Sequence, residues 1–438
     1  MIRLSGFLAA LLSVLALCAP AHAGERGPAT ADCPQGVLTL TLLKPQANPP
    51  TPAMISAWEA SNKCTKIELN EVPFGQLADK ISVLAASGNP PDILMFDGPN
   101  TQSYAASGIL LPLDKYLPAG LKDDIDPATL AEHSYEGHVY SPGTQQTALA
   151  LFYNADMLAP LGITPPRDLD HAWTWDQAMD AIKKCQKGEG DNVTVWGLAP
   201  SRFGSGNPGF VYRDLLFLRT YGDPKAPEDG SLYKTYWSLS RDGKTAQGWV
   251  NSPEAIEGAK FFSAMFNVEK ITPKAGIPNA FQDRKACFTI DTSYFIGALV
   301  ANDPGFKWGV TPLPYKRTPI VHTGSITLGV TAKSKFPDEA AKFVIEVSTG
   351  TIAADWNRTS RSLPVMKSIA ADIPELKVYP LSIFEEELVR WGEPRPPSPH
   401  FAQYDKIASD ALRDIAYGAD PKTRIDAAAR ALQPILSR

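Results

Sequence analysis

Short apolar strands and amphipathic helices alternate along residues 37–97, and this alternation constrains the fold more than any other feature of the chain. Strand-like apolar runs cover 37–43, 65–72 and 92–96, and helical patterns cover 51–63 and 74–87. Strands and helices joined in this order by short connections form right-handed crossovers, which place the strands in one parallel sheet. We therefore predict an α/β fold in which helices cover both faces of a doubly wound sheet.

In sheets of this kind, ligands bind beyond the carboxyl ends of the strands. Asp97 follows Phe96 at the end of the third strand, and the loop 44–48, which contains Gln46, follows the first strand. The loop and the aspartate are therefore expected at the same edge. Two interpretations of Asp97 stay open at this point: its carboxylate caps the next helix, or it faces something that binds there.

The chain has 438 residues, more than one hydrophobic core normally takes, so we expect two lobes. Helical patterns recur at 210–221 and 253–267, and at the C-terminus Asp420 is expected to cap a helix that begins at Pro421. A net charge of −5 gives no basic footprint for nucleic acid, and nucleic acid is not expected as a partner.

Residues 1–23 have the pattern of a secretory signal peptide, with Arg3 near the start, an apolar stretch, and small residues at Ala21 and Ala23. The apolar stretch is short for a membrane helix, and no basic stop-transfer segment follows it. We expect cleavage after Ala23 and export to the periplasm, with no membrane insertion of the mature chain.

Four cysteines remain once Cys18 is removed with the signal peptide, and an even number in an exported protein permits disulfides. Cys33 and Cys64 precede strands that start side by side, so we predict a bridge between them. Cys185 and Cys287 fit a second bridge or two buried thiols. No pair of cysteines has metal-ligand spacing, and neither a metal nor a cofactor is expected.

Known catalytic signatures are mostly missing from the sequence. Residues 204–209 match a dinucleotide-binding glycine pattern, but Pro208 interrupts it and a loop is favoured. Nine tryptophans and fourteen tyrosines suit stacking on sugar rings, which favours a sugar-binding protein. The alternative is an exported carbohydrate-active hydrolase that uses two of the many carboxylates.

Seven segments follow one another in the order typical of the family 1 extracellular solute-binding proteins of ABC importers. These segments are 88–96, 137–158, 174–185, 281–294, 307–314, 324–344 and 362–368. The chain resembles this family, which contains maltose- and glycerol-phosphate-binding proteins, over essentially its whole mature length. The resemblance implies a periplasmic binding protein fold: two α/β lobes, each a mostly parallel sheet flanked by helices, joined by three hinge crossovers.

The same resemblance implies a monomer that captures a saccharide or sugar derivative between the lobes and delivers it to permease subunits in the membrane. The implied crossovers lie near 144–148, 322–326 and 357–363. The implied division is 1–23 for the signal peptide, 24–146 and 324–358 for lobe 1, and 147–323 and 359–438 for lobe 2 with the C-terminal helices.

Candidate ligand-binding residues also come from the resemblance, position by position. They are Gln46, Phe96, Asp97, Gln145, Gln146, Trp173, Tyr294, Gly324, Arg358, Arg361, Trp391 and Arg395. Tyr294 stands where the family commonly has a stacking tryptophan, and we expect it to form aromatic walls with Trp173 or Trp391. The three arginines suggest a ligand with an anionic substituent, although arginine donors also bind the hydroxyls of a neutral sugar.

Overall fold

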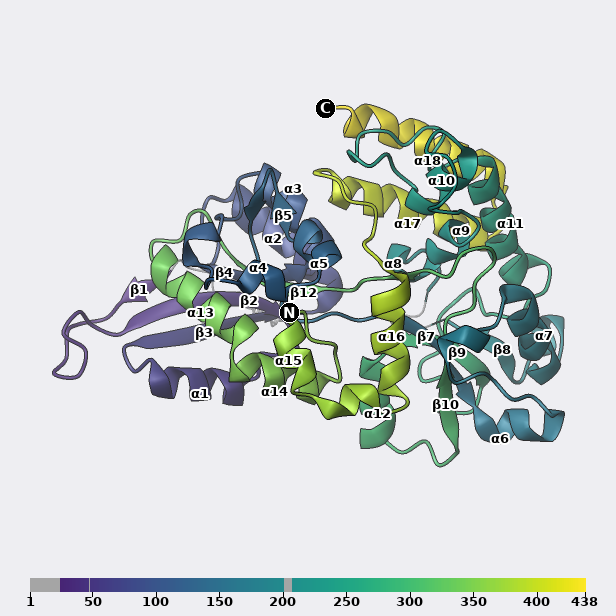
Figure 1. The fold of residues 1–438 in the computed structure, drawn as a ribbon, viewed down its shortest axis with the longest axis horizontal. Coiled ribbons are helices and arrows are strands. Elements are labelled where there is room, and N and C mark those ends of the chain that lie inside the picture. The colour runs from purple at the N-terminus through teal and green to yellow at the C-terminus, as the bar shows by residue number, and fades with distance from the viewer. Residues whose placement is uncertain (1–23, 47, 201–206) are drawn as a thin grey trace, which may run out of the picture.

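The computed structural model describes residues 24–46, 48–200 and 207–438. These residues form two lobes that lie side by side along the longest axis of the molecule (Figure 1). The expected signal peptide lies outside the described residues, and so do the first three residues of the glycine pattern 204–209.

The first lobe contains a five-stranded sheet, in which β3, β2, β4 and β12 are neighbours in that order and β1 pairs with the start of β2. The bounds are β1 (Glu25–Arg26), β2 (Leu38–Pro45), β3 (Thr65–Val72), β4 (Ile93–Asp97) and β12 (Ile326–Val330). β2 is parallel to β3 and to β4, which confirms the parallel sheet predicted from the alternation of strands and helices. β12 is antiparallel to β4.

Side chains of the first sheet alternate between two cores because successive residues of a strand point to opposite faces. Leu42 and Met95 belong to one core, with Trp58 of α1 and Phe343 of α13, whereas Leu43 belongs to the other, with residues of α2 and α3. The helices of this lobe are α1 (Pro52–Ser61), α2 (Leu77–Ala86), α3 (Thr101–Ala106), α4 (Leu121–Asp124), α5 (Pro127–Glu132), α13 (Pro337–Thr349), α14 (Thr351–Ser360) and α15 (Lys367–Ala371).

The second lobe contains a four-stranded sheet in the order β10, β7, β9, β8. Its strands are β7 (Leu149–Asn154), β8 (Trp196–Ala199), β9 (Ala286–Thr292) and β10 (Trp308–Thr311). Its helices are α6 (Ala155–Leu158), α7 (Trp175–Cys185), α8 (Val211–Asp214), α9 (Leu216–Arg219), α10 (Ser231–Trp237), α11 (Pro253–Asn267), α12 (Tyr294–Ala301), α16 (Leu381–Trp391), α17 (Phe401–Ala416) and α18 (Pro421–Leu436).

The expectation of a mostly parallel sheet is wrong for the second lobe. Only β8 and β9 are parallel, whereas β7 is antiparallel to both β9 and β10. β7 follows directly on a crossover from the first lobe, so it starts at the edge where β8 and β9 end. The same reason explains why β12, which follows the second crossover, runs opposite to β4.

The helix predicted for 253–267 is α11, and the helix predicted for 210–221 is split into α8 and α9. At the C-terminus, the Asp420 side chain accepts a hydrogen bond from the Thr423 amide at 2.8 Å, as predicted for the cap of α18. Two short pairs complete the strands: β5 (Ser134–Tyr135) with β6 (His138–Val139), and β11 (Val321–His322) with β13 (Gly392–Glu393).

Backbone hydrogen bonds link the three connecting segments between the lobes. The amide of Gln146 donates to the carbonyl of Leu363 at 2.6 Å, and the amide of Leu363 donates back at 2.9 Å. The amide of Gly324 donates to the carbonyl of Thr147 at 3.0 Å. The first crossover therefore runs between the other two, and we call these linked segments the crossover ladder.

The described residues form two disulfides. Cys33 and Cys64 are bridged, with Cα atoms 5.5 Å apart, as the placement of both residues before neighbouring strands predicts. Cys185 at the end of α7 is bridged to Cys287 of β9, which decides between the two alternatives left open for this pair.

Candidate ligand-binding site

A buried ion pair joins the two lobes at the end of β4. Arg395, in the loop after β13, donates from both terminal nitrogens to Asp97, with Nη1–Oδ2 and Nη2–Oδ1 distances of 2.6 Å. The Arg395 side chain is 4% exposed and that of Asp97 is 25% exposed. Asp97 begins a short 3₁₀ turn (Gly98–Asn100), but its side chain caps nothing there. Of the two interpretations of this aspartate, the structure therefore excludes the cap.

Two aromatic rings lie beside the guanidinium of Arg395. It lies 5.1 Å from the ring centre of Tyr212 on α8 and 5.7 Å from that of Phe401 at the start of α17. Burial opposes its charge, but Asp97 and Glu132 hold the pKa of Arg395 above its usual value, so the guanidinium stays charged. Its Nε is buried and has no hydrogen-bond partner among the described residues.

Two further carboxylates lie near this ion pair. Glu132, at the end of α5, accepts a hydrogen bond from the Ser325 hydroxyl, and burial raises the pKa of Glu132 to about 7. Burial also raises the pKa of Asp405 on α17 to about 6, although Arg395 opposes this shift. We call Asp97, Glu132, Tyr212, Arg395, Phe401 and Asp405 the Asp97 cluster. Its three carboxylates face one guanidinium.

Glycines let the backbone approach this cluster closely. A Cβ atom on Gly98 would lie 1.6 Å from the Ser325 hydroxyl oxygen, and one on Gly324 would lie 2.2 Å from the Thr147 hydroxyl oxygen. A side chain at either position would therefore displace its neighbours. Gly324 was predicted as a ligand-binding residue, and the structure places it in the crossover ladder beside Thr147 and Tyr212.

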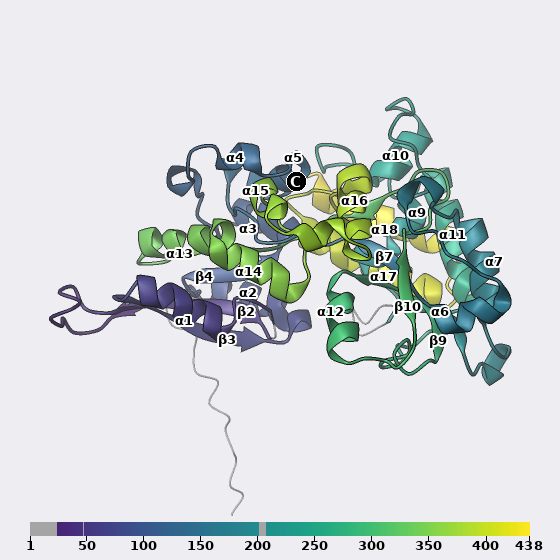
Figure 2. The ribbon, with the colours of Figure 1, turned by 60° about the horizontal axis from the view of Figure 1, so that its bottom comes forward.

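A cavity of about 370 Å³ lies at the carboxyl ends of β8 and β9, a volume in the range typical of small-molecule sites. Apolar and polar side chains share its wall: Ala199, Pro200, Ile277, Pro278, Asn279, Ala280, Phe281, Gln282, Thr289, Asp291 and Phe295. Phe295 comes from α12, which lies on the side of the second lobe that faces the first (Figure 2). Aromatic rings combined with amide and carboxylate groups are suited to a sugar.

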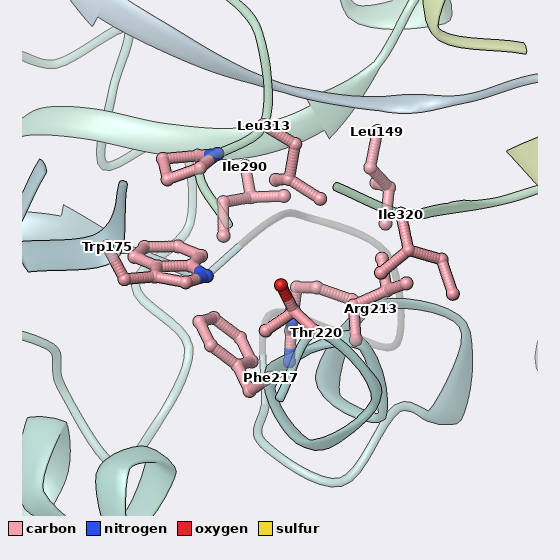
Figure 3. A pocket seen from close by; sticks show the side chains of 10 residues that line it. Leu149, Trp175, Arg213, Phe217, Thr220, Ile290, Leu313 and Ile320 are labelled. Carbon is pink, nitrogen blue, oxygen red and sulfur yellow. The ribbon is translucent and has the colours of Figure 1, made fainter. Parts of the chain in front are cut away.

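A second, much smaller cavity lies inside the second lobe. Its volume is about 10 Å³, room for about one water molecule, and the side chains of Trp175, Phe217, Ile290 and Leu313 converge on it (Figure 3). Trp175 also packs against Phe217, with ring centres 4.8 Å apart. Trp175 is thus a packing residue.

The two predicted tryptophans, Trp173 and Trp391, pack against or within the core of the second lobe. Trp173 lies against Phe288, with ring centres 6.4 Å apart, and Trp391 is 9% exposed and lies 6.5 Å from the ring of Tyr315. Neither lines the 370 Å³ cavity. Trp391 is thus buried in the hydrophobic core of this lobe and Trp173 lies partly buried against it, which gives no support to the aromatic walls predicted from them.

Phe96 and Tyr294 lie in different surroundings. Phe96 is 1% exposed and packs edge-on against Tyr104, which gives no support to the ligand contact predicted for it. Tyr294 begins α12, and its hydroxyl faces Ser362 and Ser360 of the third crossover. Burial raises the pKa of this phenol.

The predicted glutamines lie in different surroundings. The side-chain oxygen of Gln145 accepts a hydrogen bond from the Trp356 indole, and the side-chain amide of Gln146 donates to the Thr129 hydroxyl at 2.8 Å. Both side chains are buried within the crossover ladder. Gln46 is exposed at the end of β2, on the edge that also carries Asp97.

The three predicted arginines do not form one group. Arg395 belongs to the Asp97 cluster, whereas Arg358 and Arg361 line a separate cavity at the end of α14. The sequence analysis missed Glu132, Tyr212, Phe401 and Asp405. These residues come from three separate helices, α5, α8 and α17, and no local pattern marks any of them.

Comparisons with known proteins agree on one family. A family model described as bacterial extracellular solute-binding protein matches residues 44–349. A Brucella abortus binding protein whose name states no ligand is 23% identical over 443 residues, covering 98% of this chain and 97% of that protein. The maltotriose-binding protein of Pyrococcus abyssi is 23% identical over 378 residues, covering 82% of this chain and 72% of that protein.

A solved structure shows the same fold. An ABC substrate-binding protein from Listeria monocytogenes, in complex with cycloalternan, matches with a TM-score of 0.75. The sequence identity is 18%, and the match covers 91% of this chain and 98% of that chain. At this identity the likeness establishes the two-lobed fold and nothing about the ligand.

Proposed function

Because this chain belongs to the bacterial extracellular solute-binding protein family, we propose that it captures a saccharide between its lobes and delivers it to the permease of an ABC importer. The family consists of binding proteins, so the hydrolase alternative is dropped. The observation that carries the proposal is the Asp97–Arg395 pair, which joins the lobes at the strand edge where ligands of such sheets bind.

Two relatives support a saccharide as the ligand class. The Pyrococcus abyssi protein is named for maltotriose, and the Listeria monocytogenes structure contains cycloalternan. The chemistry of the Asp97 cluster agrees, since carboxylates accept hydrogen bonds from sugar hydroxyls and a guanidinium donates to them. The rings of Tyr212 and Phe401 offer flat apolar faces beside these polar groups.

We propose a neutral saccharide over an anionic one for this site. Arg395 is already paired with Asp97, and Glu132 and Asp405 add two more carboxylates nearby. An anionic ligand would place another negative charge beside three acidic groups, whereas hydroxyl donors would satisfy them. Arg395 is therefore a weaker reason to expect an anionic substituent on the ligand.

Export to the periplasm and delivery to a permease belong to the same proposal. The family model describes extracellular proteins, and residues 1–23 have the pattern of a signal peptide. Within the described part of the chain, no helix combines the length and the apolar character needed to cross a membrane. We propose that the mature chain works as a monomer.

Calorimetric titration of the mature chain with maltotriose, maltose and other neutral oligosaccharides tests the function. At least one neutral saccharide is expected to bind and to raise the melting temperature, because a ligand that binds only the folded state stabilises it. Asp97→Asn should weaken that binding about tenfold or more, since it removes a charged acceptor. Failure of every saccharide to bind, together with no sugar in native mass spectra of the purified protein, would overturn the proposal.

A further inference from the structure

Two arginines line a cavity that shares no residue with the Asp97 cluster. The cavity has a volume of about 230 Å³ and lies where the chain runs from α14 in the first lobe to α16 in the second (Figure 1). Its wall is formed by Asn357, Arg358, Thr359, Arg361, Ser362, Ile373, Glu375, Leu376 and Leu381. Two guanidinium groups and one carboxylate therefore meet around an apolar floor.

Arg361 occupies a backbone conformation that favours glycine. It follows the last residue of α14 with φ +57° and ψ +26°, in the left-handed region. Glycine is the usual residue there because it has no Cβ atom to clash. An arginine at this position carries a strain that a glycine would avoid, and strained residues often mark functional sites.

The guanidinium of Arg361 has no ion pair or hydrogen bond to any described residue. Arg358 is partly engaged, since its Nη2 donates to the carbonyl of Asp372 at 3.0 Å and its Nη1 lies 3.7 Å from Asp355. Glu375 lies on the exposed rim. The cavity thus offers the unpaired guanidinium of Arg361 and the partly paired guanidinium of Arg358. The planar donors of a guanidinium match the oxygens of a carboxylate or phosphate.

The wall of the cavity is built into the crossover ladder. The Asn357 side chain donates to the carbonyl of Thr144 in the first crossover and accepts from the Ser362 hydroxyl at 2.8 Å. Across the lobes, the Cγ of Arg361 would lie 3.3 Å from a Cβ atom placed on Gly297 of α12. A rotation of one lobe against the other therefore changes the shape of this cavity.

We propose that the arginine cavity is a second binding site, for a small carboxylate- or phosphate-bearing anion, and that its occupant alters saccharide affinity through the third crossover. Anion binding itself does not depend on the proposed function, whereas the coupling to saccharide affinity rests on it. Coupling between two sites is reciprocal, so each ligand must change the affinity of the other by the same factor.

Thermal shift and calorimetry with inorganic phosphate and with succinate, at constant ionic strength set by sodium chloride, test the site. The test variant is Arg361→Gly, which removes the guanidinium and suits the left-handed backbone, so the fold should be retained. Arg358→Gln is a second test variant. Arg390→Gln is the matched control, because Arg390 is a half-exposed arginine on α16 that pairs with Asp170 outside the cavity.

Saturable binding of phosphate or succinate to the wild type and to Arg390→Gln, weakened at least tenfold in Arg361→Gly, is the expected result. Binding of phosphate but not of succinate would identify a phosphate site, and binding of succinate but not of phosphate would identify a carboxylate site. No saturable binding of either probe, or equal binding by all variants, would overturn the proposed site. If the anion binds but the saccharide affinity stays constant, the coupling is overturned and the saccharide function stands.

Discussion

Among single residues, Asp97 shows how far sequence reasoning can go. The apolar run before it ends on a carboxylate, so its place at the ligand edge of the sheet follows from local pattern alone. Its partner Arg395 is 298 residues away and was identified only through family resemblance. Glu132 and Asp405 carry no local signal, because their raised pKa values come from burial among distant segments.

Loss of the Asp97 charge should destabilise the protein. Asp97→Asn leaves the buried guanidinium of Arg395 without its closest partner, and breaking a buried ion pair in this way costs about 3–5 kcal/mol. Glu132 and Asp405 lie nearby, so the lower end of that range is expected. Urea unfolding measures the loss. The control Asp170→Asn breaks an exposed ion pair with Arg390 and should cost under about 1 kcal/mol.

The contribution of Glu132 to the stability of the protein should fall as the pH rises from about 4.5 to about 7. Burial raises the pKa of Glu132 from 4.5 to about 7, so in this window the folded state binds a proton that the unfolded state has released. The Glu132→Gln variant has no carboxyl group at this position, so its stability should fall less over this pH range. Melting temperatures at pH 5 and pH 7.5 test it, with the exposed Glu68→Gln as control. An equally steep fall in all three proteins would contradict the assignment.

At the level of elements, local pattern predicted where strands and helices lie better than how the strands pair. β3 and α11 begin and end at the residues predicted. The direction of β7 was not predictable in this way, because it depends on which lobe the preceding segment leaves. The split of the predicted helix 210–221 into α8 and α9 likewise has no local signal in the sequence.

The two disulfides should contribute unequally to stability. Cys185 and Cys287 are 102 residues apart in sequence, and Cys33 and Cys64 are 31 apart. A longer closed loop restricts the unfolded chain more, and the loop-entropy model gives a difference of about 1 kcal/mol. Urea unfolding of the two double serine variants measures this difference. A larger loss for the Cys33–Cys64 pair would show that native packing around the bridges outweighs loop length.

For the whole molecule, the ion pair between Asp97 and Arg395 is expected to hold the lobes together in the absence of ligand. Arg395→Gln removes its charge, while the hydrogen bond from the Ser103 hydroxyl to the Pro399 carbonyl still crosses between the lobes. Small-angle X-ray scattering should show a larger radius of gyration for this variant than for the wild type. An unchanged radius would mean that this ion pair is not needed to hold the lobes together.

The crossover ladder also has a consequence for how the chain is made. β4 lacks its neighbour β12 until residue 330 has been synthesised, and Gln146 lacks its partner Leu363 until later still. Neither lobe is a continuous stretch of sequence, so a growing chain cannot complete one lobe before the other has begun. A partly synthesised chain of this kind exposes the unpaired edge of a strand and contains no completed domain. Neither lobe can therefore complete its fold until most of the chain has been synthesised.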